Sequence, residues 1–207
     1  NWAQRLPGLA GSTPVRLRVD QVSAVEQATA AGVPVLGADG APVLTAVTAR
    51  VPRKRLLVVS ETTVAKLHGA ALDRALAQGG LSVEHVSLPP GEGSKSFATL
   101  QTLCDALLDL RIERGDVILA FGGGVIGDLA GFAAATWMRG VDWVGIPTTL
   151  LSMVDSSIGG KVGLNHAKAK NMIGAFHQPR AVVVDPSFLA TLPVRQLRSG
   201  AYEVLKC

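Results

Sequence analysis

The sequence predicts an α/β protein with a largely parallel sheet and helices on both faces of that sheet. Three observations lead to this prediction. Continuous apolar runs, typical of buried parallel strands, occupy 56–59, 117–121 and 143–146. Segments with apolar residues at helical spacing lie between these runs. The 23 glycines and 11 prolines in 207 residues exceed the average share of about 12 % for these two types, which indicates many tight connections.

Each element is predicted from its own local pattern. A strand at 15–19 comes first, and the Ala-, Gly- and Pro-rich stretch 28–42 is expected to be a long loop or an insertion. From Arg55 onward, strands alternate with helices over short connections, which predicts parallel crossovers. On 96–110, apolar residues predict one buried stripe of Phe97, Leu100, Leu103, Leu107 and Leu108. The expected order is strand 56–59, helix 64–76, strand 83–86, loop 88–95, helix 96–110, strand 117–121, turn 122–127, helix 128–137, strand 143–146, strand 181–184 and a final helix from Ser199 to Cys207.

Composition excludes several classes of protein. A hydrophobic content of 48 % with 17 % charged residues excludes intrinsic disorder. The net charge of +4 comes from scattered basic residues, and the densest run, 53–55, is expected to be solvated surface, so no nucleic-acid partner is expected. Cys104 and Cys207 lie far apart, which argues against a disulfide framework and favours a reducing, cytoplasmic location.

The longest apolar stretch, 117–138, is long enough to cross a membrane but does not have the character of a span. It carries Asp128 near its middle and is interrupted by glycines. A buried carboxylate at membrane depth costs about 2.5–3.5 kcal/mol. No membrane association is therefore expected, and there is no signal segment at the start. Because the chain opens on Asn and stops within a helical pattern, we expect it to be a piece of a longer protein.

The sharpest local signal is the sequence FGGGVIGD at 121–128. It satisfies G-x-G-x-x-G at Gly122, Gly124 and Gly127, directly after a predicted strand and at the start of a predicted helix. Glycines let the backbone approach a diphosphate, and the helix N-terminus offers free N–H groups, so a Rossmann-like phosphate site is predicted. The alternative is that the glycines only relieve crowding at a crossover. Asp128 is expected in the first turn of the helix, where an acidic side chain favours binding of ribose hydroxyls over a bare phosphate. Asp142 lies at the usual distance from the glycines for the acid that binds the ribose; alternatively, it only starts a strand.

A second group of polar residues follows the strand that ends at Pro147. Thr148 and Thr149 come first, then Asp155 and Lys161, then Lys170-Asn171. Ligands of open α/β sheets bind at the carboxyl ends of the strands, so these side chains predict a phosphorylated or polyhydroxylated ligand. The histidines at 166 and 177 are interpreted as structural. Glu203 and Lys206 share one helical face, which on its own predicts an ordinary surface ion pair.

Several longer motifs together resemble the 3-dehydroquinate synthase family. They are PGEGSK at 90–95, FGGGVIGDLAGFAAATWMRG at 121–140, IPTTLLSMVDSSIGGK at 146–161, the NH-x3-KNMIGAF-x-QP pattern at 165–179 and the LP-x-R-x-L-x-SG-x2-EV-x-K pattern at 192–206. The match covers roughly residues 55–207 in unbroken order.

The resemblance implies a Rossmann-like NAD-binding domain followed by a helical domain, with the chain truncated at the start of the latter. The implied divisions are an N-terminal strand and variable loop region at 1–50, the NAD-binding α/β domain at 51–191, and the beginning of the helical metal and substrate domain at 192–207. The implied reaction converts 3-deoxy-D-arabino-heptulosonate 7-phosphate to 3-dehydroquinate and phosphate in the shikimate pathway. It implies catalytic NAD, a divalent metal (zinc or cobalt) and a homodimer.

The resemblance also implies roles for matching positions. Glu92 and Lys95 would contact NAD, with Lys161 and Lys170 also bordering it, and Arg139 would reach the neighbouring subunit's phosphate site. Glu203 would be a metal ligand, with two histidine ligands expected beyond Cys207, so the chain as given is expected to bind NAD without turnover. The remaining NAD positions are Gly123, Gly124, Val125, Ile126, Gly127, Asp128, Thr148, Thr149, Phe188, Leu189, Ala190 and Thr191; the substrate positions are Asp155, Lys161, Asn171 and Lys206, with Lys161 and Asn171 toward the phosphate.

Three alternatives stay open at this point. The segment KVGLN at 161–165 resembles sister cyclases of the 2-epi-5-epi-valiolone synthase type, and Val162 stands where the dehydroquinate enzymes more often have Thr. An iron- or zinc-dependent alcohol or glycerol dehydrogenase would share the general architecture. The 207 residues by themselves could act only as an NAD-binding module.

Overall fold

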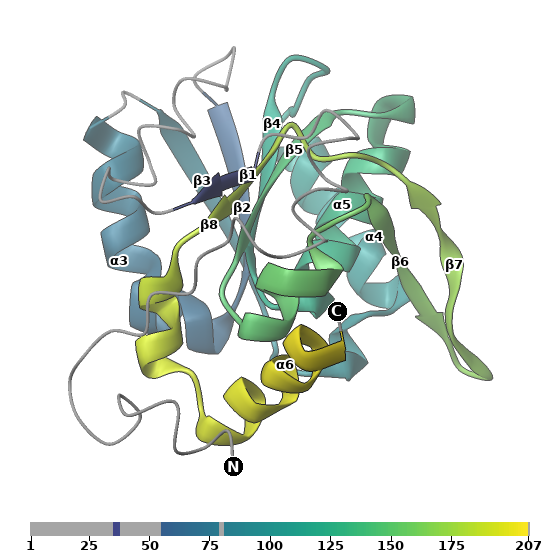
Figure 1. The fold of residues 1–207 in the computed structure, drawn as a ribbon. Helices are drawn as coiled ribbons and strands as arrows, with labels where there is room; N and C mark the ends of the chain where they lie inside the picture. Colours follow the sequence, from purple (N-terminus) through teal and green to yellow (C-terminus); the bar gives the residue numbers. More distant parts are fainter. Residues whose placement is uncertain (1–34, 38–54, 79–80, 207) are drawn as a thin grey trace.

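The computed structural model describes residues 35–37, 55–78 and 81–206. Its centre is a six-stranded sheet in the order β1-β8-β5-β4-β2-β3, in which all neighbours run parallel (Figure 1). The strand β4, buried at every position, carries the apolar run that the sequence analysis used. The strands are β1 (Val35–Gly37), β2 (Arg55–Glu61), β3 (Ser82–Leu88), β4 (Val117–Gly122), β5 (Asp142–Pro147) and β8 (Ala181–Val184).

Helices cover both faces of the sheet, which confirms the predicted fold class. Helix α3 (Thr62–Gln78) lies on one face, while α4 (Phe97–Asp109) and α5 (Gly124–Thr136) lie on the other (Figure 1). Each face has its own apolar cluster: Leu72 and Leu76 of α3 belong to one, and Leu103 and Leu129 of α4 and α5 belong to the other. Because the central strands β4, β5 and β8 bury side chains on both faces, nearly all of their residues are apolar.

A two-stranded antiparallel hairpin stands beside this sheet. It consists of β6 (Lys161–His166) and β7 (Ala169–Phe176), and it packs against α5 (Figure 1). Gly131 makes the contact possible, because a Cβ atom there would lie 2.4 Å from Val162 Cγ1. The sequence analysis did not predict this hairpin. The longer of its strands, β7, is mostly exposed, so it lacks the apolar run that marks the central strands.

The strand order reverses at β2, which positions the site. From β2 the chain moves outward to β3, then returns to the other side of β2 for β4 and β5. In parallel sheets, ligands bind beyond the carboxyl ends of the strands at such a reversal. Glu61, Gly122 and Pro147, the last residues of β2, β4 and β5, therefore mark the edge where a ligand is expected.

One short turn and one longer helix complete that edge. The π-helical turn η5 (Ser152–Ser156) follows β5, and α6 (Val194–Lys206) packs on it. Gly200 permits this packing, because a Cβ atom there would lie 2.6 Å from the Leu151 nitrogen. Single π-helical turns in proteins are often found at functional sites.

Several predicted boundaries are wrong. Helix α5 begins at Gly124 instead of residue 128, because the glycines at 124 and 127 are taken into the helix and only Gly123 forms the turn. Helix α6 begins at Val194 instead of Ser199. The predicted loop 28–42 contains strand β1, which pairs with β8 through only three residues, too few to give a sequence signal. The predicted strand 15–19 lies outside the described residues.

The predicted apolar stripe of α4 is only partly buried. Leu103 and Leu107 are fully buried, whereas Phe97 and Leu108 are 54 % and 62 % exposed. Helical spacing places all of these residues near one face, but the sheet covers only its centre. Within the described part of the chain, no helix has the length and apolar character needed to cross a bilayer.

Candidate dinucleotide and phosphate site

The turn between β4 and α5 consists of Gly123 alone. Its carbonyl accepts the N–H groups of Ile126 and Gly127, both at 3.1 Å, which leaves the N–H groups of Gly124 and Val125 for a partner outside the helix. Gly122 allows the helix to approach the strand, because a Cβ atom there would lie 2.7 Å from Ile126 Cγ1. At Gly127, in contrast, a Cβ atom would meet nothing within 4 Å. Gly127 therefore faces open space and is not required by packing.

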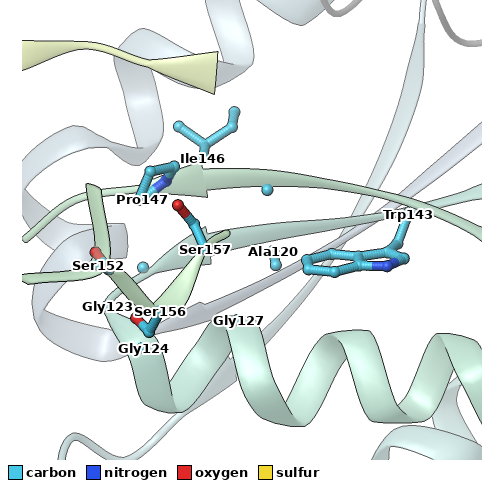
Figure 2. A pocket seen from close by; sticks show the side chains of 12 residues that line it. Ala120, Gly123, Gly124, Gly127, Trp143, Ile146, Pro147, Ser152, Ser156 and Ser157 are labelled. Atoms are coloured by element: carbon cyan, nitrogen blue, oxygen red, sulfur yellow. The ribbon is translucent and has the colours of Figure 1, made fainter. Parts of the chain in front are cut away.

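Polar side chains without partners surround this glycine turn. Figure 2 shows Ser156 beside Gly124, with Ser157 close by, in a small hollow under the turn. The buried hydroxyl oxygens of Thr148, Ser156 and Ser157 have no hydrogen-bond partner within the described parts of the chain. The Thr148 N–H donates to Gly122 O at 3.0 Å, which ties the end of β5 to the turn. Unsatisfied buried hydroxyls at a helix N-terminus fit a diphosphate, with its many acceptor oxygens.

A cavity of about 500 Å³ opens next to the turn, between α5, η5 and the hairpin. It brings together residues that the sequence analysis placed in one site from separate segments. Two cationic side chains, two carboxylates and one amide line it: Lys95, Lys161, Asp128, Asp155 and Asn171. Such a mixture of cations and hydrogen-bonding groups can hold a phosphorylated, polyhydroxylated molecule.

Lys95 connects three elements at the base of this cavity. Its side chain is only 5 % exposed, and its ammonium donates to Asp128 Oδ2 and to Asn171 Oδ1, the latter at 2.5 Å. Burial raises the pKa of the Asp128 carboxyl above its ordinary value, against the opposing effects of Lys95 and Lys161. Asp128 lies in the second turn of α5, which corrects its predicted place in the first turn, and it accepts a hydrogen bond from Lys95. Its predicted role toward the NAD ribose stays a prediction.

A second cavity, of about 350 Å³, lies on the other side of Thr148 and Thr149. Phe188 and Thr191 line it, together with His68 and Glu61, to which the sequence analysis gave no role. His68 Nε2 lies 2.8 Å from Thr191 Oγ1, and its ring meets Phe188 edge to face. Glu61 at the end of β2 has its pKa raised by burial.

Some predicted site residues have other neighbours. The Thr149 hydroxyl caps the following helix through Ser152, with the two oxygens 2.8 Å apart. The side chain of Leu189 packs against a buried apolar cluster that includes Met153 and Ile158. Glu92 is exposed and accepts a hydrogen bond from Asn165 Nδ2 at 2.7 Å. Val125, Ile126 and Ala190 can contribute only backbone or apolar contact, and Ile126 is fully buried in the core.

Other predicted residues are not brought into the large cavity. Asp142 starts β5, at the end of the strand opposite to the site, and pairs with Arg180 at 2.8 Å, so it is not a ribose acid. Arg139 follows the C-terminal end of α5, about 20 Å from Gly124 along the helix axis. Lys170 is exposed on β7. His177 is structural, as predicted, because its Nε2 donates to Val141 O at 2.8 Å.

Glu203 and Lys206 both lie on α6. Among the described residues there is no group of three or more His, Cys, Asp and Glu side chains that could hold a metal ion. Glu203 alone therefore does not form a metal site, because a catalytic metal needs about three protein ligands.

Comparisons with known proteins identify the family of the chain. The family described as 3-dehydroquinate synthase N-terminal matches residues 85–199, more than half of the chain. The chain belongs to the 3-dehydroquinate synthase family. A family member from Synechococcus sp. is 53 % identical over 152 residues, which are 73 % of this chain and 41 % of that protein. The chain thus spans less than half the length of this relative.

Two solved structures extend the comparison to sister enzymes of the family. The 2-epi-5-epi-valiolone synthase from Streptomyces hygroscopicus, solved with NAD+ and Zn2+, is 34 % identical with a TM-score of 0.77, covering 84 % of this chain and 48 % of that one. A 2-deoxy-scyllo-inosose synthase complexed with carbaglucose-6-phosphate, NAD+ and Co2+ is 28 % identical with a TM-score of 0.76, covering 83 % and 47 %.

Besides Glu61 and His68, sequence reasoning missed three polar contributors to the site. Ser156 and Ser157 stand next to the predicted Asp155, but serine is too common in turns to be singled out. Asn165 precedes a histidine in a quoted motif, and its side-chain contacts depend on the hairpin, which was not predicted.

Proposed function

We propose that this chain forms the NAD-binding part of a 3-dehydroquinate synthase. The enzyme would convert 3-deoxy-D-arabino-heptulosonate 7-phosphate to 3-dehydroquinate and inorganic phosphate, as a phosphate-eliminating lyase of the shikimate pathway. One observation supports this most directly: Lys161, Asn171 and Asp155 converge in one cavity beside the N-terminus of α5. Membership of the family supports the same reaction.

NAD fits the glycine turn. Donors and room for a diphosphate come from three features: the open space at Gly127, the N–H groups of Gly124 and Val125 that precede the first bonds of the helix, and the Thr148 hydroxyl, which has no partner among the described residues. The cavity at Phe188, Thr191 and Glu61 then lies where one nucleoside would extend. The two sister cyclases were both solved with NAD+, which supports NAD as the ligand.

The chain's own residues have distinct tasks in this proposal. Bound NAD supplies a transient oxidation of a ring hydroxyl and is recovered, so there is no net redox change. Lys161 and Asn171 hold the substrate phosphate through charge-assisted hydrogen bonds, and Asp155 faces the ring hydroxyls. Lys95 holds Asp128 and Asn171 in place between the two ligands.

A divalent metal, zinc or cobalt, is part of the proposal. Glu203 would supply one ligand, and the remaining ligands would come from outside residues 1–207. We therefore propose that residues 1–207 alone bind NAD but do not turn over substrate. The solved sister cyclases with Zn2+ and Co2+ support the choice of metals.

The domain divisions and the oligomer are proposals as well. Residues 1–50 form an N-terminal strand and variable loop region, 51–191 the NAD-binding domain, and 192–207 the beginning of the helical domain, whose α6 contacts η5 of the NAD-binding domain. The enzyme is a homodimer in which Arg139 reaches the neighbouring subunit's phosphate site. Its exposed position at the far end of α5, with a backbone φ of 69°, supports a role outside its own cavity. The two distant cysteines support a cytoplasmic location.

The decisive experiment measures two products at once in the intact protein, given the heptulosonate phosphate, NAD and zinc. We expect phosphate release with no accumulation of NADH. A dehydrogenase would instead accumulate NADH with an alcohol and release no phosphate. Calorimetry on residues 1–207 should detect NAD binding without turnover, and a folded sample with no NAD affinity would contradict the site described above.

A sister cyclase of the 2-epi-5-epi-valiolone synthase type is the second candidate. Val162 favours it, because this side chain is buried against Gly131 where the dehydroquinate enzymes more often carry Thr. Identification of the carbocyclic product by mass spectrometry separates the two: 3-dehydroquinate supports the first proposal, and 2-epi-5-epi-valiolone supports the second.

A further inference from the structure

The hairpin is irregular at the point where it enters the large cavity. Leu164 pairs with Ile173 and His166 pairs with Ala169, so the single residue Asn165 stands opposite the three residues 170–172. Such bulges are frequent next to active sites, where they redirect a side chain. Here the redirected residue is Asn171, whose backbone adopts a left-handed conformation with φ of 58°.

Asn165 makes three hydrogen bonds that hold this bulge in place. Its backbone N–H donates to Lys95 O at 2.9 Å. Its side-chain Oδ1 accepts the backbone N–H of Asn171 at 3.1 Å, in place of the strand pairing that the bulge interrupts. Its Nδ2 donates to Glu92 Oε1 at 2.7 Å. One amide thus connects the hairpin to the turn that carries Glu92 and Lys95.

We infer that Asn165 is a positioning residue with two separate arms. The acceptor arm, Oδ1, fixes the Asn171 backbone and so directs the Asn171 side chain to Lys95 and the cavity. The donor arm, Nδ2, fixes Glu92 and the turn on the cofactor side. This inference rests on the proposed function, which assigns the sugar phosphate to the acceptor arm and NAD to the donor arm. The hydrogen bonds of Asn165 are observed independently of that function.

Only an amide serves both arms. A carboxylate at this position still accepts from the Asn171 N–H but has no donor for Glu92, and it places a like charge beside the Glu92 carboxylate. An apolar side chain of similar size, such as leucine, fills the space and removes both arms. The two substitutions therefore separate the acceptor arm from the donor arm.

The test uses the intact protein with Asn165→Leu, Asn165→Asp and, as a matched control in the same hairpin, Lys168→Ala. We expect Asn165→Leu to raise both the Kd for NAD and the KM for the sugar phosphate by about tenfold, while Asn165→Asp raises the Kd for NAD alone. Lys168 is exposed, and only its backbone N–H bonds within the hairpin, so the control should match the parent. If Asn165 had a purely structural role, both variants would be less stable than the parent. The Kd for NAD and the KM for the sugar phosphate would then change together in each variant.

A second readout does not depend on activity. Amide hydrogen exchange at Asn171 should speed up in Asn165→Leu and stay slow in Asn165→Asp, because only the latter keeps the acceptor. Parent-like exchange at Asn171 in a folded Asn165→Leu variant overturns the inference, as does parent-like NAD affinity in Asn165→Asp. If Asn165→Leu does not fold, the Asp variant still decides. If the parent itself releases no phosphate, the proposed function fails while the exchange result continues to test Asn165.

Discussion

At the scale of single residues, the centre of the site is the buried ammonium of Lys95. An unpaired buried charge would cost several kcal/mol, so the fold must supply partners for it. Asp128 from α5 and Asn171 from the hairpin do so from two different elements. The geometry of the cavity is therefore set before any ligand arrives.

The raised pKa of Asp128 gives a pH prediction. Below the ordinary aspartate pKa of about 3.9, this carboxyl is protonated in both the folded and the unfolded chain. As the pH rises past that value, the unfolded chain loses its proton first, so the unfolded state binds fewer protons and stability falls until the raised pKa of the folded state is passed. Across this window, the parent should lose free energy of unfolding relative to Asp128→Asn. Denaturant unfolding of both proteins at a series of pH values measures this loss. If the free energy of unfolding of the parent minus that of Asp128→Asn stayed constant or grew as the pH rises, the burial of the charged carboxyl would be contradicted.

Lys161 gives the second prediction at this scale. If it holds the phosphate, Lys161→Ala in the intact protein should lower kcat/KM for phosphate release by about a hundredfold or more, because a charge-assisted contact to the leaving group is lost. Lys168→Ala removes a lysine seven positions along the same hairpin and should leave kcat/KM unchanged. Steady-state kinetics of both variants and the parent measures kcat/KM for phosphate release. If Lys161→Ala and Lys168→Ala lost kcat/KM equally, the loss would come from the change in net charge and not from a contact to the phosphate.

At the scale of elements, glycines along α5 have opposite roles. Gly131 lets the hairpin approach the helix, while Gly127 faces open space. Both lie in the same helix, where glycine itself costs up to about 1 kcal/mol relative to alanine. The difference between them therefore comes from their surroundings.

Gly127→Ala should stabilise the ligand-free protein by up to about 1 kcal/mol, because helix propensity rises and nothing is displaced. The same methyl group should weaken NAD binding by about tenfold if the diphosphate lies there. Gly69→Ala in α3, which also has nothing within 4 Å, is the matched control and should stabilise without changing the Kd for NAD. Thermal unfolding measures the stability, and calorimetry measures the Kd for NAD. An unchanged Kd in Gly127→Ala would show that the diphosphate does not lie beside this residue.

Gly131→Ala should have the reverse effect on stability. Its Cβ atom would lie 2.4 Å from Val162 Cγ1 and 3.1 Å from Trp143 Cζ2, so the hairpin must shift. We expect a loss of about 1–3 kcal/mol, typical of overpacking. The double variant with Val162→Ala should recover part of this loss in denaturant unfolding, and no recovery would mean that the clash is relieved elsewhere.

At the scale of the whole molecule, Arg139 tests the proposed dimer. Arg139→Ala and Lys161→Ala should each be inactive as pure dimers. In an equal mixture after subunit exchange, half of the dimers are mixed and each has one intact site, so about a quarter of the parent activity should return. Phosphate release before and after mixing measures it. If no activity returns although mass spectrometry detects mixed dimers, Arg139 does not act across the interface.

The central sheet was predictable because each of its main strands carries a local signal. The apolar runs at 56–59 and 117–121 need burial on both faces, and only a parallel sheet between helices provides that. The hairpin was not predicted, although its two strands are adjacent in sequence, because β7 is mostly exposed and carries no buried apolar run. The three-residue β1 was not predicted because it pairs with β8, which is distant in sequence. The start of α5 was misplaced because glycines usually mark turns, whereas here Gly124 and Gly127 lie inside the helix.

The sequence by itself determined the fold class, and it predicted a phosphate site at the glycine turn together with the residue types that gather around it. These follow from local patterns, since burial of a strand and capping of a helix depend mainly on neighbouring residues. Only the tertiary structure decided that Asp128 binds Lys95, that Asp142 lies at the opposite end of its strand, and that Asn165 holds a bulge. Each of these depends on which distant segments meet, and that is fixed by packing of the whole chain.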